Sequence, residues 1–153
     1  MSTNSIGDLF PQSWKKDLAK ANFKIGAVLK LYCHIAQKEK RFILAGIKYN
    51  KQEVALVHIN SEINNNVFPS QKLKDEHLLL TNTEDRTYID KNCYANCSQL
   101  IPRNYEELYK LLENNPSIHL GEMSDTDFKL VRDKIVASKI IRRDLKKDFA
   151  LFL

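Results

Sequence analysis

The 153-residue sequence has little glycine, proline or cysteine, and several motifs are missing altogether. With only 4 glycines and 4 prolines it shows no low-complexity tract and no repeat, so a repeat architecture is excluded. Three cysteines are an odd number, which argues against a disulfide framework. No window approaches the roughly 20 consecutive apolar residues that a membrane span requires. The N-terminal MSTNSIGDLF has no basic stretch followed by an apolar run, so we expect a cytoplasmic protein with reduced thiols and no membrane partner.

The composition is that of an ordinary globular protein with a moderate positive charge. Hydrophobic residues make up 43% and charged residues 28%, and the length suits one domain with a sizeable core. The net charge of +5 permits a polyanionic partner without requiring one. Part of the excess lies in a C-terminal segment, where it can equally be a solvated helix face: Arg142, Arg143, Lys146 and Lys147.

Most of the first two thirds of the chain has the pattern of antiparallel strands. The runs GAVLKLYCHIA (26–36), RFILAGIKY (41–49) and EVALVHINS (53–61) are rich in β-branched and aromatic residues and predict a meander. SEINNNVFPSQKLK (61–74) predicts an exposed loop. Three further strands are predicted at HLLLT (77–81), RTYID (86–90) and NCYANCSQLI (92–101). Five or six short strands suffice for a small closed barrel.

Helices are predicted at both ends of this region. Residues 1–23 predict an amphipathic extension, separate from a main domain at 24–153. Asn104 with Glu107 predicts a capping box, and Pro116 ends that helix. A second helix is predicted from Ser124, with Phe128, Val131, Ile135 and Leu145 as its buried face. Strands first and helices last indicate an α+β fold or a small barrel with appended helices.

The cysteines and histidines do not have the spacing of a metal site. On one strand, Cys93 and Cys97 would lie ~13 Å apart at ~3.3 Å per residue. That separation is too wide for one zinc ion or for a disulfide, so both are predicted to fill the barrel interior. The four histidines show no HExxH spacing, and GxGxxG, GxxxxGK[ST] and GxSxG motifs are missing. We therefore expect no metal and no cofactor.

Five short segments, taken in order, resemble the MazF/PemK (Kid) superfamily of toxin endoribonucleases. They are IGAVLKLY at Gly26, KRFILAGI at Arg41, VALVHINSEI, NCSQLIPRN at Cys97, and LGEMSDTDF at Gly121 and Ser124. The similarity spans roughly residues 24–141. It implies a mostly β fold with α-helices, an SH3-like antiparallel barrel with a long C-terminal helix. It also implies a homodimer, for which the sequence offers a large apolar set: Phe128, Val131, Ile135, Phe149 and Phe152.

The resemblance implies a chemistry for particular residues. Members of the superfamily cut single-stranded RNA by attack of the 2′-hydroxyl on phosphorus, which needs two proton-transfer groups and a cation. Arg41 matches the family arginine, the family threonine falls on Asn60, and His58 could supply a titrating group on the same strand face. Six further residues are expected to contact RNA: Lys38, Lys40, Ser61, Asn96, Ser98 and Gln99.

Two functions remain open at this point. The first is a metal-independent endoribonuclease toxin, with single-stranded RNA as substrate, an antitoxin protein as partner and the loop 61–74 beside the RNA groove. The second is a barrel that has lost cleavage and binds nucleic acid or a protein. Asn96 and Ser98 occupy family charged positions and cannot act as acid or base, and Phe42 replaces a family proline, which favours the second. Arg41 and the basic surface favour the first.

Overall fold

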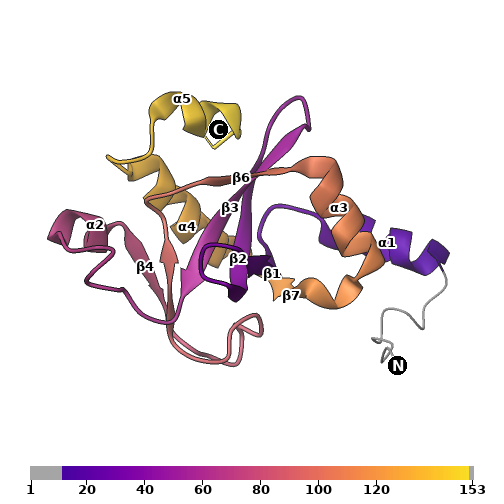
Figure 1. Cartoon of the computed structure of the whole chain (residues 1–153), viewed down its shortest axis with the longest axis horizontal. Coiled ribbons are helices and arrows are strands. Elements are labelled where there is room, and N and C mark those ends of the chain that lie inside the picture. The colour runs from indigo at the N-terminus through magenta and orange to yellow at the C-terminus, as the bar shows by residue number, and fades with distance from the viewer. Residues whose placement is uncertain (1–11, 152–153) are drawn as a thin grey trace.

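A single antiparallel sheet, curled into a half-barrel, organises the computed structural model, which describes residues 12–151 (Figure 1). The strand order is β4-β5-β3-β2-β1-β7, and β6 pairs with the first half of β3 beside β5. The strands are β1 Ala27–Cys33, β2 Lys38–Ile47, β3 Glu53–Asn60, β4 His77–Leu80, β5 Cys93–Asn96, β6 Ile101–Asn104 and β7 His119–Glu122. The predicted meander is β1, β2 and β3, and the fold is mixed α/β.

Helices pack on both faces of this sheet. They are α1 Gln12–Asn22, α2 Gln71–Asp75, α3 Tyr105–Asn114, α4 Asp125–Ala137 and α5 Arg143–Asp148, with a 3₁₀ turn η2 at Pro116–Ile118. Asn104 Oδ1 accepts from the Glu107 backbone N–H, which is one of the two bonds of the predicted capping box, and Ser124 Oγ accepts from the backbone N–H of Asp127. No helix within residues 12–151 is long and apolar enough to cross a membrane.

Several predicted elements differ from the structure. Residues 86–90 form turns instead of a strand, closed by backbone bonds from Arg86 to Thr83 and from Ile89 to Arg86. The predicted strand 92–101 is divided into β5 and β6 by a turn at Cys97–Ser98, so the two cysteines do not share a strand. A short helix, α2, lies within the predicted loop 61–74, and β7 had no predicted counterpart. The C-terminal segment consists of two helices, and Leu145 lies on α5.

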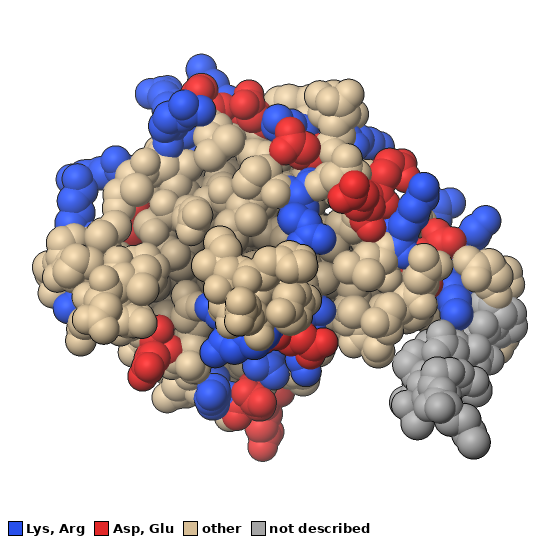
Figure 2. Space-filling model, viewed as in Figure 1, with Lys and Arg blue, Asp and Glu red and all other residues tan. Residues whose placement is uncertain are grey.

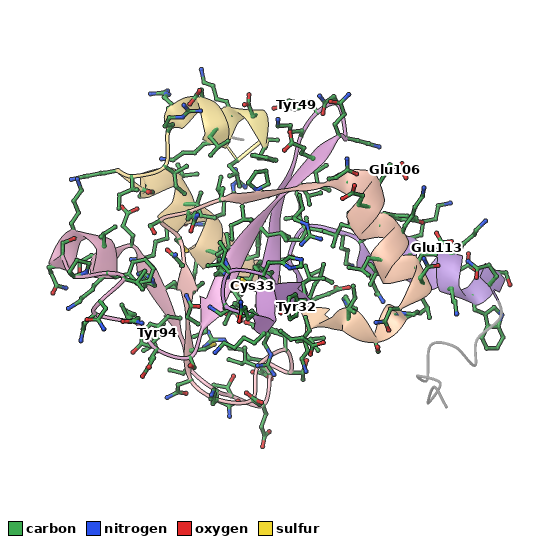
Figure 3. The ribbon with its side chains drawn as sticks, viewed as in Figure 1. Tyr32, Cys33, Tyr49, Tyr94, Glu106 and Glu113 are labelled. Atoms are coloured by element: carbon green, nitrogen blue, oxygen red, sulfur yellow. The ribbon has the colours of Figure 1, made fainter. Side chains whose placement is uncertain are left out.

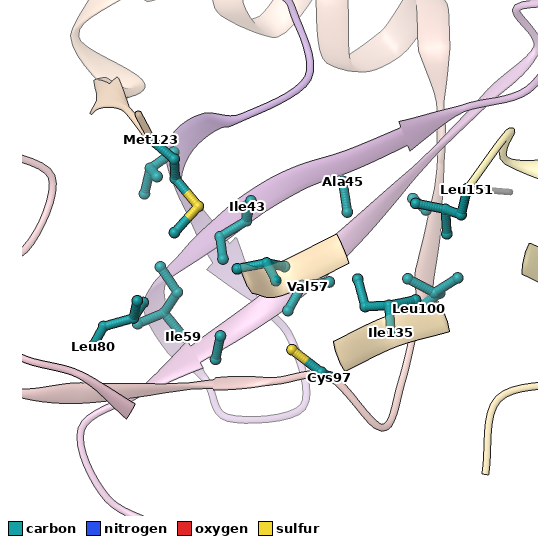
Figure 4. Packing of buried hydrophobic residues seen from close by; sticks show 14 of the residues in the cluster. Ile43, Ala45, Val57, Ile59, Leu80, Cys97, Leu100, Met123, Ile135 and Leu151 are labelled. Atoms are coloured by element: carbon teal, nitrogen blue, oxygen red, sulfur yellow. The ribbon is translucent and has the colours of Figure 1, made fainter. Parts of the chain in front are cut away.

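Strand alternation gives the sheet two buried faces with separate hydrophobic clusters. The first cluster lies under α4 and the C-terminal segment and includes Ile43, Ala45, Val57, Ile59 and Ile135 (Figure 4). The second lies under α1 and α3 and includes Phe42, Leu44, Val54, Leu56 and Leu108. Because strand residues alternate between these faces, one-residue shifts of register would move charged side chains into a core.

The N-terminal helix α1 is packed against the domain. Ala19 and Phe23 are buried members of the second cluster. The Phe23 ring makes edge contacts with Tyr105 at 4.8 Å and Tyr109 at 5.4 Å between ring centroids. Residues 1–11 of the predicted extension lie outside the described residues.

A buried carboxylate joins α4 to the turns at 81–92. Arg86 donates to Asp127 with both Nε and Nη2, each at 3.0 Å, and Tyr88 donates its hydroxyl to Asp127 at 2.9 Å. These bonds hold the pKa of Asp127 below its ordinary value, chiefly through Arg86, and burial raises the pKa of Tyr88. Arg86 also donates to the Thr81 carbonyl, so one side chain joins the start of the segment to α4.

We expect Asp127→Ala to lower the free energy of unfolding by ~3 kcal/mol, because it leaves Arg86 and Tyr88 without their partner. That is the low end for a buried pair, since the Arg86 and Asp127 side chains keep 18% and 12% exposure. Asp125→Ala, in the same first turn of α4 but exposed, should cost only ~0.3–1 kcal/mol. Urea denaturation measures both; equal losses would contradict this role for Asp127.

Close packing of the C-terminal segment depends on one glycine of β2. A Cβ added at Gly46 would lie 2.8 Å from both the Cβ and the carbonyl oxygen of Phe149. We expect Gly46→Ala to cost ~1–3 kcal/mol, because a buried neighbour must move to accept the methyl group. Thermal unfolding compared with Glu39→Ala, an exposed change on the same strand, checks this; unaltered stability of Gly46→Ala would refute it.

Candidate functional site

A cavity of about 540 Å³ opens at one end of the sheet. Its walls come from the β1–β2 hairpin, the end of β3 with the segment after it, and the turns at 81–92. It brings together all of the predicted site residues except one: Lys38, Lys40, Arg41, His58, Asn60, Ser61, Asn96 and Gln99. Ser98 does not line the cavity, but its backbone N–H and its hydroxyl donate hydrogen bonds to Asn96 Oδ1. In Figure 3, Cys33, another lining residue, and Tyr94 lie on either side of the end of β3.

Strand register decides which side chains face one another here. Lys40 pairs with Leu31 and His58 with Phe42, which places Lys40, His58 and Asn60 on the face of the second cluster. Lys40 Nζ donates to Asn60 Oδ1 at 2.8 Å. Arg41 pairs with Ile59 and belongs to the opposite face, so it approaches the cavity around the end of the strands.

Arg41 has spare capacity to donate hydrogen bonds. Its Nη2 lies 3.4 Å from Asp90 Oδ2, and its side chain is 31% exposed. Its Nε is buried and has no hydrogen-bond partner within residues 12–151. The accessible part of the guanidinium, whose Nη2 makes only the 3.4 Å contact with Asp90 in the described chain, can donate to a phosphate oxygen. The guanidinium is therefore suited to an anionic ligand.

His58 is a neutral imidazole at physiological pH. Burial, and secondly the nearby Lys40 charge, lower its pKa from the ordinary 6.5 to about 4. Its ring packs on Phe42 with centroids 4.6 Å apart. In this state His58 can accept a proton or a hydrogen bond, but it cannot donate a proton as imidazolium near pH 7.

The sequence interpretation missed the contribution of residues 89–91. Asp90 and Lys91 line the cavity, and Asp90 provides a solvent-accessible carboxylate beside Arg41. Asp90 was predicted to be the last residue of a strand at 86–90, and Lys91 to lie between that strand and the next. Acidic and basic side chains are mixed in this region, and Figure 2 shows blue and red atoms gathered together below the centre of the view.

The cysteines are buried or half-buried and free. Cys97 belongs to the first cluster, and burial raises its pKa to about 12, so it is a protonated thiol. Cys93 lines the cavity, and burial raises its pKa as well. In the described part of the chain no three His, Cys, Asp or Glu residues are grouped as metal ligands.

The apolar residues on which the homodimer was predicted have another role. Val131, Ile135 and Phe149 are fully buried in the first cluster of the same chain, and Phe128 packs against it. Phe152 lies outside the described residues. Val131, Ile135 and Phe149 are therefore not available to a dimer interface, because α4 and the C-terminal segment use them to cover the open half of the curled sheet, and the homodimer stays a prediction.

Comparisons with known proteins were made on sequence. Neither models of known protein families nor curated proteins give a match to this chain.

We expect the free energy of unfolding to fall as the pH is lowered from about 6.5 to about 4, because the unfolded chain protonates His58 before the folded chain does. His58→Gln should reduce this slope. NMR titration of the His58 ring should give a midpoint near 4. A midpoint near the ordinary 6.5 would contradict the buried, neutral imidazole.

Proposed function

We propose that this chain is the toxin of a type II toxin–antitoxin pair, an endoribonuclease with a MazF/PemK-like, SH3-like barrel that cleaves single-stranded RNA. The observation that carries the proposal is one cavity lined by Arg41 and Asn60, which the resemblance selected, together with Lys40 and His58, which the sequence places beside them. The curled antiparallel sheet is compatible with such a barrel. A second copy of the chain, an antitoxin protein and a cytoplasmic location belong to the same proposal.

The reaction assigns each group a task. The 2′-hydroxyl oxygen attacks the adjacent phosphorus, the bond from phosphorus to the 5′-oxygen breaks, and the products are a 2′,3′-cyclic phosphate and a 5′-hydroxyl. Arg41 stabilises the phosphorane charge through the accessible part of its planar guanidinium. Asp90 or neutral His58 accepts the 2′-hydroxyl proton, and the departing 5′-oxygen takes a proton from solvent water, which the accepting group's proton replaces. Lys40, held by Asn60, fixes a phosphate oxygen.

The existing Arg41–Asp90 contact does not prevent this use. Asp90 has 71% of its side chain exposed, and exposed ion pairs are worth only ~0–1 kcal/mol. Charge-assisted bonds from arginine to phosphate are stronger, particularly when the guanidinium donates two of them to one phosphate. A phosphate can therefore displace Asp90 from Arg41 or share Arg41 with it. The Asp90 carboxylate is then free to take a proton.

A second candidate is a binding module of the same fold that does not cleave RNA. It is favoured by the low pKa of His58, about 4, which makes the imidazole a weak base at neutral pH. It would bind single-stranded RNA through the same cations, with affinity that falls steeply as salt rises.

We expect Arg41→Ala to reduce RNA cleavage ~10²–10³-fold, because it removes the cation that offsets the phosphorane charge. Arg41→Lys should recover only part of the rate, since an ammonium lacks the planar fork. Arg142→Ala, an exposed change with the side chain 77% accessible and remote from the lining residues, is the matched control.

The measurement is the initial rate on a mixed single-stranded RNA, with circular dichroism to verify folding. Equal cleavage by folded Arg41→Ala and wild type would sink the catalytic assignment. Wild-type binding with no cleavage would instead select the binding module.

A further inference from the structure

The carboxamide of Asn96 is locked in one orientation on the cavity wall. Its Oδ1 accepts hydrogen bonds from the Ser98 backbone N–H at 3.1 Å and from the Ser98 hydroxyl. A backbone N–H can only donate, so the atom that faces it must be the carbonyl oxygen. Asn96 is only 3% exposed and lines the cavity. The –NH₂ group is therefore the end left for a ligand.

The carboxamide of Asn60 is also held with its oxygen turned away from the ligand, by a different donor. Its Oδ1 accepts from Lys40 Nζ at 2.8 Å, and an ammonium group can only donate. Neither Asn60 Nδ2 nor Asn96 Nδ2 has a hydrogen-bond partner in residues 12–151. Both nitrogen atoms keep some solvent-accessible surface. Both asparagines thus present donors only.

The two donors lie within the span of one nucleotide base. Asn60 is directly opposite Tyr94 in the β3–β5 pair, and Asn96 is two residues beyond Tyr94 on the same face. Diagonal neighbours of this kind are separated by about 7–8 Å. Val67 and Phe68 line the same cavity and provide apolar surface for a ring.

We propose that Asn60 and Asn96 form a donor pair that selects keto bases, uracil or guanine, in the single-stranded RNA bound at this cavity. This rests on the proposed function, which it deepens with a base preference. Uracil O4 and guanine O6 are acceptors at the position where cytosine and adenine carry amino groups, which are donors. The amino group of cytosine or adenine would face a fixed –NH₂ group of the protein. Because both groups are donors, neither would have an acceptor. Ser98 acts as a positioning residue that prevents the Asn96 amide from turning its oxygen outward.

The test uses the full chain and two oligonucleotides, the octamers of 2′-deoxyuridine and 2′-deoxycytidine. They differ at position 4, which is an acceptor in uracil and a donor in cytosine, and at N3, which is a donor in uracil and an acceptor in cytosine. Without a 2′-hydroxyl they cannot be cleaved. Fluorescence anisotropy at fixed salt should show about tenfold tighter binding of the uracil octamer, the size expected for one good base contact. Octamers of deoxyguanosine and deoxyadenosine, in lithium buffer, test the purine arm in the same way.

Variants separate recognition from folding. Asn96→Ala should make the uracil and cytosine octamers bind equally, and Asn96→Asp should favour cytosine because its outer oxygen accepts from N4. Ser98→Ala should weaken the preference, and Gln52→Ala, an exposed amide outside the cavity, should leave it unchanged. If Asn96→Asp does not fold, Asn96→Ala and Ser98→Ala still decide the question.

Equal binding of both octamers by wild type, binding of neither, or a preference that survives Asn96→Ala would overturn the inference. Those results would not refute the proposed RNA cleavage, because cleavage is measured separately on ribonucleotides. A uracil preference without any cleavage of RNA would support the base recognition and refute the nuclease function.

Discussion

The Asp127 carboxylate is the contact on which the shape of the cavity depends. It receives three hydrogen bonds from Arg86 and Tyr88, and its own backbone N–H is capped by Ser124 at the start of α4. A negative charge in the first turn of a helix is also favoured by the helix dipole. Asp127 therefore lies in the first turn of α4 and also holds the turns that follow β4.

Those turns contribute one wall of the cavity, beside the strands and the segment that follows β3. With Arg86 fixed, residues 89–91 pass the end of the sheet and place Asp90 beside Arg41. The remaining polar groups stand on β2, β3 and β5, where backbone pairing sets their spacing. A rigid sheet and one anchored segment together create a mixed-charge site without a long flexible loop.

The sequence predicted the parts of this arrangement that depend on local pattern. Alternating β-branched residues revealed β1 to β3, and neighbouring strands of a meander necessarily bring Lys40, His58 and Asn60 together. The RTYID run has a strand-like pattern, yet Arg86 and Tyr88 bond to Asp127, 41 and 39 residues further on, and no local signal reveals such a contact. Asp90 was missed for that reason.

Apolar residues near the C-terminus illustrate the same limit. Val131, Ile135 and Phe149 have the spacing of an interface, but a curled sheet exposes a concave apolar face that the chain covers with its own helices. Only the three-dimensional arrangement distinguishes the two uses. The Asn96–Ser98 turn likewise converts residues that lack acid–base chemistry into a fixed hydrogen-bond donor.

The most direct test of the account is the chemistry of RNA ends after incubation of single-stranded RNA with the purified protein in EDTA. The account predicts fragments with a 2′,3′-cyclic phosphate and a 5′-hydroxyl, because the 2′-hydroxyl is the nucleophile. Fragments with 5′-phosphate ends, or RNA that stays intact, would contradict it.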